Sequence, residues 1–205
     1  MKAFFFGCLL IFLDFHLELN SVRIGLLPNF VGYYLLLRGM RELKEYSPHF
    51  SAPRGVVAAL MVYSAILWGL DLLGLGEEYL PVELQVLLLV LGLLATLGLL
   101  YSFYQIVSGI LEMETAFLAD LRGKTLRHLW MAMAALDPSV SVCWLLALSM
   151  NAATNIELFG GFIGILAVIS VIMKLVFTYY IYRSGQAYEA ALQGKKSSSS
   201  QKSQG

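Results

Sequence analysis

The sequence predicts an all-α integral membrane protein with about six transmembrane helices, arranged as three helical hairpins. Composition is the first reason: hydrophobic residues make up 59% of the 205 positions, charged residues make up 14%, and the mean hydropathy is +0.73. Soluble domains carry about 25% charged residues, so a water-soluble fold would have too little polar surface to cover this chain. The lengths of the apolar runs and the placement of Lys and Arg are the other two reasons.

The apolar runs are long enough for helices that cross a bilayer, which requires about 20 residues at a rise of about 1.5 Å each. Pro81 suits the first turn of the fourth run, where its missing N–H is harmless, and Gly74 and Gly76 suit the end of the third. The predicted spans lie near residues 3–19, 24–43, 54–75, 81–107, 130–151 and 158–182.

Two of these spans contain interruptions. The first begins like a secretion signal, but no A-x-A cleavage site follows, so we interpret it as a span. Asp14 and His16 lie in its last third, and Asp137-Pro138 lies within the fifth span. A count of five spans is therefore the alternative.

Twelve of the 14 Lys and Arg residues fall on one side of this arrangement, with only Arg23 on the opposite side and Lys174 inside a span. Basic loops are retained on the cytoplasmic side during insertion. The sequence therefore predicts a membrane protein surrounded by lipid bilayer, with both termini in the cytoplasm. The twelve residues are Lys2, Arg38, Arg41, Lys44, Arg54, Arg122, Lys124, Arg127, Arg183, Lys195, Lys196 and Lys202.

The even-numbered spans share a pattern that indicates an internal repeat, which is common in membrane transporters. The alternative is chance, because aromatic residues and glycines are frequent in membrane helices. The hairpins are predicted near residues 1–46, 54–118 and 130–192 of one transmembrane domain, 1–192, and residues 193–205 are predicted to form a disordered cytoplasmic tail. The three copies are Tyr33-Tyr34 with Gly39, Phe103-Tyr104 with Gly109, and Tyr179-Tyr180 with Gly185.

Polar residues gather in the outer half of the first hairpin, and an ionisable group inside a bilayer costs at least about 2.5 to 3.5 kcal/mol. Asp14 and Asn29 lie at similar distances from the turn near residues 20 and 21, which predicts that they meet across the hairpin. His16 and Arg23 are nearby, and Pro28 frees a backbone carbonyl. This pattern favours a polar pocket for a cation or small polar solute, with His16 as a protonation switch. Alternatively, these side chains lie at the interface and satisfy one another.

Asp137 and Lys174 form the second candidate site. They lie symmetrically about the turn between the fifth and sixth spans, so an antiparallel hairpin brings them to the same depth as an ion pair. Alternatively, Asp137 is an N-cap followed by Pro138, residues 124–136 form an interfacial helix, and Lys174 extends toward a surface.

No catalytic motif, phosphate-binding glycine loop or metal-ligand spacing is found, so the sequence predicts a protein that is not an enzyme and has no cofactor. Cys8 and Cys143 lie apart in apolar runs and are interpreted as buried thiols. No basic patch typical of nucleic-acid binding is present.

The stretches Phe12-Leu13-Asp14-Phe15, residues 24–33 (IGLLPNFVGY) and residues 38–43 (RGMREL) resemble a family of uncharacterised bacterial multi-pass membrane proteins, mainly from Gram-positive lineages. The family pattern is LDF followed by LPDxxGY and a helix with a basic end, and Asn29 stands where that pattern has Asp. The resemblance covers about the first quarter of the chain. It implies a location in the bacterial cytoplasmic membrane and a helical fold, and it implies no activity.

Small-solute or ion transport, or solute binding, through the polar pocket of the first hairpin is the function that the sequence favours. Six spans in about 200 residues are also similar to the substrate-binding membrane subunits of vitamin importers, an analogy of size and architecture alone. The alternative is a noncatalytic partner or assembly subunit that packs against another membrane protein.

Overall fold

The computed structural model describes residues 1–13, 16–19, 22–25, 28–73, 81–117, 119–149 and 156–202. Six α-helices contain most of these residues, which confirms the predicted helical fold. A short antiparallel strand pair and one 3₁₀ turn are also present. The elements are α1 (Lys2–Phe12), β1 (His16–Leu19), β2 (Val22–Gly25), α2 (Asn29–Leu43), η1 (Pro48–Phe50), α3 (Arg54–Leu72), α4 (Val82–Phe117), α5 (Gly123–Ser149) and α6 (Ile156–Lys202).

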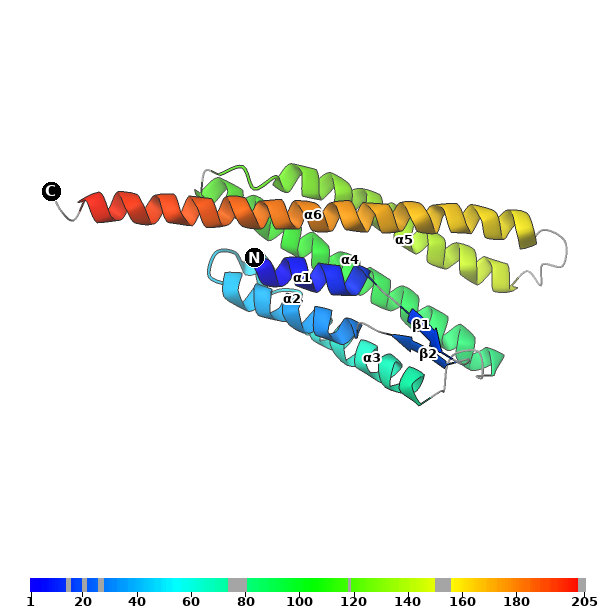
Figure 1. The fold of residues 1–205 in the computed structure, drawn as a ribbon. Helices are drawn as coiled ribbons and strands as arrows, with labels where there is room; N and C mark the ends of the chain where they lie inside the picture. Colours follow the sequence, from blue (N-terminus) through cyan, green and yellow to red (C-terminus); the bar gives the residue numbers. More distant parts are fainter. Residues whose placement is uncertain are drawn as a thin grey trace.

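Successive helices run in opposite directions along a common axis (Figure 1). Each helix packs against the next in sequence, and α1 also packs against α6, so the six helices close into a ring. The ring is filled by a row of aromatic side chains, in which the centroid of Phe103 lies 5.4 Å from that of Phe12 and 5.3 Å from that of Phe177. Helices α1, α4 and α6 therefore share one core.

Three helical segments are long and apolar enough to cross a membrane: Pro48–Leu72, Leu84–Phe117 and Gly160–Gly194. Their surfaces carry large apolar side chains such as Val62, Leu94 and Ile172, each more than half exposed. A soluble monomer rarely exposes continuous apolar surface on this scale, because it would aggregate in water. These features indicate a membrane protein.

The first hairpin differs from the expectation of two long helices. Helix α1 has 11 residues and α2 has 15, so continuous helices over residues 3–19 and 24–43 are wrong. Between them β1 pairs with β2, with His16 opposite Gly25 and Glu18 opposite Arg23. The sequences His-Leu-Glu-Leu and Val-Arg-Ile-Gly alternate polar and apolar residues, and this period of two is the signature of a strand.

Helices α5 and α6 also differ from parts of the prediction. Helix α5 runs unbroken from Gly123 to Ser149 with Pro138 inside it, so the alternative in which a helix begins at Asp137 is wrong. Helix α6 continues to Lys202, where a disordered tail was expected. No proline interrupts residues 193–202, and extending an existing helix requires no new nucleus.

Two aromatic rings fill the space between α2 and α4. Phe4 lies so close to Gly39 that a Cβ added at this glycine would be 2.7 Å from the ring. Phe50 lies equally close to Gly109, where an added Cβ would be 2.6 Å from the ring. The two rings stack on each other with centroids 5.9 Å apart. The third glycine of the sequence pattern, Gly185, lies against Met1 instead.

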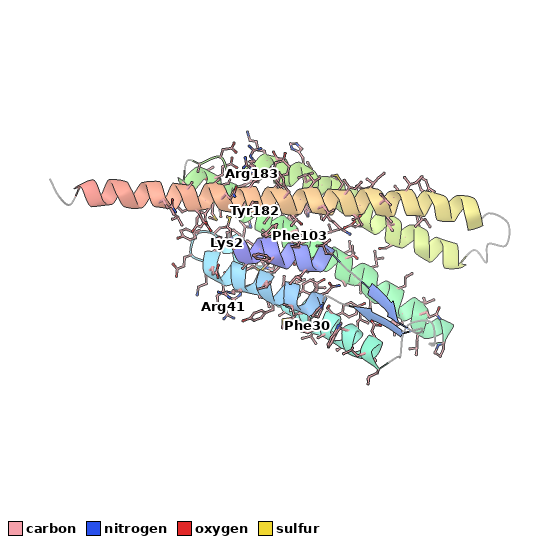
Figure 2. All side chains as sticks on the ribbon, viewed as in Figure 1. Lys2, Phe30, Arg41, Phe103, Tyr182 and Arg183 are labelled. Carbon is pink, nitrogen blue, oxygen red and sulfur yellow. The ribbon has the colours of Figure 1, made fainter. Side chains whose placement is uncertain are left out.

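One end of the helical ring is rich in basic side chains. Figure 2 shows Lys2, Arg41 and Arg183 at this end, while Phe103 and Phe30 lie farther along the axis. Lys2 is paired with Glu189 at 3.5 Å there, on exposed surface. We call this end, marked by Lys2, Arg41 and Arg183, the basic end.

Candidate functional site: a partly buried ion pair between α5 and α6

The two residues that the sequence predicts to pair are brought together by α5 and α6. Lys174 Nζ lies 3.2 Å from Asp137 Oδ1. The Asp137 side chain is only 9% exposed and that of Lys174 is 25% exposed. Removing charges from water is costly, and mutual attraction offsets the cost only when further hydrogen bonds satisfy both groups.

The Ser170 hydroxyl provides such a hydrogen bond, because it donates to the same Asp137 oxygen. That oxygen is therefore held by an ammonium group and a hydroxyl from the same helix. The backbone carbonyls of both charged residues also accept hydrogen bonds from side-chain hydroxyl groups. Thr178 Oγ1 donates to Lys174 O at 2.8 Å, and Ser141 Oγ donates to Asp137 O at 3.3 Å.

Lys174 lies on the packed face of α6, with 25% of its side chain exposed. Ser170, Phe177 and Ile181 are all buried, and they are separated from Lys174 by four, three and seven residues, which puts them on one face of α6. The ammonium group thus belongs to the interior face of the helix.

The ion pair lies well away from the basic end. Lys174 is nine residues before Arg183, about 13 Å along the helix, and Asp137 is ten residues after Arg127, about 15 Å. The alternative in which Lys174 extends toward a surface is wrong, because its Nζ is directed at Asp137 on the neighbouring helix.

Pro138 removes one backbone N–H donor from α5 next to the pair. Inside a helix a proline lacks the N–H that would bond to the carbonyl four residues earlier, here that of Ala134. A kink or an unpaired carbonyl at this point is a common device for accommodating polar groups in apolar helices.

The end of the first helix lies next to the ion pair. Lys174 Nζ is 5.9 Å from the centroid of the Phe12 ring, and Phe12 is the last residue of α1. Asp14, two residues farther on, lies outside the described residues, as does its predicted meeting with Asn29. The backbones of His16 and Arg23 lie in the strand pair, but their side chains are outside the described part.

Pro28 and Asn29 mark the start of α2. Pro28 occupies the N-cap position and Asn29 is the first helical residue, so Pro28 does not interrupt a helix there, contrary to expectation. Within the described part of the chain, Asn29 Oδ1 is a buried acceptor without a hydrogen-bond partner. An unsatisfied buried acceptor costs about 1 to 3 kcal/mol, which a donor from a bound solute would recover.

Sequence reasoning missed Ser170 and Phe12 as members of this site. The available signal for Ser170 was its position four residues before Lys174, on the same helix face. For Phe12 no local signal existed, because its contact with Lys174 joins the first helix to the last.

The described side chains include no group of three His, Cys, Asp or Glu residues arranged to hold a metal ion. Comparison of the chain with known protein families, curated proteins and solved structures found no match. The site must therefore be interpreted from its own chemistry.

Proposed function

We propose that this chain is a bacterial cytoplasmic-membrane protein that binds or transports a small polar solute or an ion through polar groups at the first hairpin. The observation that carries the proposal is the partly buried Asp137–Lys174 pair beside the end of α1. Ionisable groups inside apolar helices are costly, and they commonly mark substrate or ion pathways.

The strand pair between α1 and α2 supports a polar pocket in that hairpin. Non-helical backbone at membrane depth is tolerated only where protein covers it or where it lines a water-filled cavity. Helix α1 is about 16 Å long and β1 adds about 13 Å, which together match a bilayer core of about 30 Å. The pocket is then formed by Asp14, His16, Arg23, Pro28 and Asn29.

The proposed topology has six crossings, with the basic end and both termini in the cytoplasm. Its support is the gathering of Lys and Arg at one end and the alternation of helix directions (Figure 1). An internal repeat of three hairpins belongs to the same proposal. Its support is the shared sequence pattern, in which Gly39 and Gly109 each lie against a phenylalanine ring, Phe4 and Phe50 respectively.

A thermal-shift screen of small polar solutes and monovalent cations on the purified full-length chain tests the function. We expect at least one compound to raise the melting temperature, and we expect Asn29→Ala and Asp14→Ala to abolish that shift while folded yield stays near that of the parent. Gln186→Ala, which removes an exposed amide at the basic end, is the matched control. Absence of any shift contradicts solute binding, and a shift that survives both substitutions contradicts the pocket.

Labelling of intact cells with a membrane-impermeant maleimide tests the topology. Lys44→Cys and Arg122→Cys are expected to react only after the membrane is opened, since they lie in the basic loops. Leu73→Cys, at an exposed position after α3, is expected to react from outside. The reverse pattern would invert the proposed orientation.

A second candidate is a noncatalytic membrane partner or assembly subunit. It is favoured by α6, whose C-terminal part extends beyond the ends of the other helices (Figure 1). If this role is correct, removing residues 195–205 should release a protein that otherwise co-purifies in mild detergent, without changing the melting temperature of the chain.

A further inference from the structure

The Asp137–Lys174 pair restricts the charge of any solute that it can accept. The two groups are equal and opposite, and each has the other as its charged partner in the pair. A simple anion that paired with Lys174 would leave the Asp137 carboxylate without a charged partner. A simple cation that paired with Asp137 would leave the Lys174 ammonium group without one. Leaving one member of a buried pair uncompensated is strongly unfavourable.

We propose that the pair opens to bind a zwitterionic solute, whose carboxylate contacts Lys174 and whose ammonium group contacts Asp137. This inference rests on the proposed function and names the class of its solute. A solute with both charges replaces one ion pair by two, so that neither buried group loses a partner. The overall charge of the site stays zero before and after binding.

The exposures of the two side chains indicate the order of contact. The Lys174 side chain is 25% exposed and that of Asp137 is 9% exposed, so a solute that enters the site is expected to contact Lys174 before Asp137. The solute carboxylate therefore contacts Lys174 and draws it from Asp137. The freed Asp137 carboxylate keeps its hydrogen bond from Ser170 and accepts the solute ammonium.

Aromatic rings next to Lys174 provide the remaining contacts. Phe12 faces the ammonium group at 5.9 Å and continues into the row of Phe103 and Phe177. This surface suits a short hydrocarbon chain between the two charges, because apolar carbon gains free energy on leaving water.

Thermal shifts of the full-length chain in detergent, with charge-matched probes, test the inference. The zwitterions are β-alanine, 4-aminobutyrate and the protein amino acids; the anions are propionate and butyrate; the cations are propylammonium and butylammonium. We expect at least one zwitterion to raise the melting temperature by about 2 to 4 °C at saturation. Neither the anion nor the cation of equal carbon number should do so.

The double variant Asp137→Asn/Lys174→Gln is expected to fold, because it removes both charges together, and to lose the shift. The exchange Asp137→Lys/Lys174→Asp, which restores both charges in reverse, is expected to regain at least part of it. Glu42→Gln is the control, since it breaks an exposed pair with Arg38 of the same 3.2 Å length at the basic end. It should leave the shift unchanged.

A shift produced only by a simple anion, simple cation or uncharged solute would overturn the zwitterion inference and leave the proposed function standing. So would a zwitterion shift that persists in the Asp137→Asn/Lys174→Gln variant. Absence of a shift with every solute and ion would overturn both.

Discussion

Helices α1 and α2 approach each other through their backbones, whereas α5 and α6 are joined by two charged side chains. A Cβ built on Gly32 would lie 2.9 Å from the Gly7 carbonyl oxygen, so the first pair is held by close van der Waals contact of small residues. Asp137 and Lys174 join the second pair at 3.2 Å. Close backbone packing thus joins α1 to α2, whereas an ion pair adds to the contacts between α5 and α6. The comparison shows that helices of this chain pack in two different ways, and the proposed function uses the second.

The largest expected effect comes from removing one member of the ion pair. Lys174→Met leaves the Asp137 carboxylate buried without its ammonium partner and should lower the free energy of unfolding by about 3 to 5 kcal/mol. Adding Asp137→Asn should restore most of this loss. Denaturant titration of the single and double variants in mild detergent measures the coupling, and strictly additive losses would contradict a direct interaction.

A smaller loss is expected where the backbones of α1 and α2 touch. Gly32→Ala forces a Cβ against the Gly7 carbonyl oxygen and should cost about 1 to 3 kcal/mol in the same titration. Gly69→Ala on α3 is the matched control, because no neighbouring atom lies within 4 Å of the added Cβ. Equal stability of the two variants would contradict the close approach of α1 and α2.

Gly109→Ala should cost less, about 1 kcal/mol, because its Cβ meets a side-chain ring that is able to shift and not a backbone atom. The ring belongs to Phe50, which stacks on Phe4. Adding Phe50→Leu should then reduce the incremental cost of Gly109→Ala. If thermal unfolding shows the same loss of stability from Gly109→Ala with and without Phe50→Leu, the close contact of Gly109 with the Phe50 ring is not the cause of that loss.

The smallest effect is expected at the exposed pair Arg38–Glu42, which has the same 3.2 Å separation as the buried pair. Glu42→Gln should change the free energy of unfolding by no more than about 0.5 kcal/mol, because water and salt screen exposed charges. If Glu42→Gln lowers the free energy of unfolding as much as Lys174→Met does, burial does not explain the difference between the two ion pairs.

Several features of the fold and the site were predictable from local pattern. The start of α3 at Arg54 and the presence of long apolar helices followed from composition and run length. The contact between Asp137 and Lys174 followed from their symmetric placement about one turn, because an antiparallel hairpin fixes which residues share a depth. The strand pair was missed even though Glu18 and Arg23 belong to alternating tetrapeptides, since a long apolar context favoured helix.

The sequence by itself determined which residues avoid water and which end of the molecule is basic, because hydropathy and charge are properties of each residue wherever it lies. Three contacts were decided only by the tertiary structure. Phe12 lies next to Lys174, Ser170 donates a hydrogen bond to Asp137, and two phenylalanines fill the space over Gly39 and Gly109. These contacts depend on how helices close into a ring, and many apolar surfaces of similar composition compete for each place. The complementary shapes of the helices and the need to satisfy buried polar groups select one arrangement. Both depend on several segments of the chain together, so no single segment predicts them.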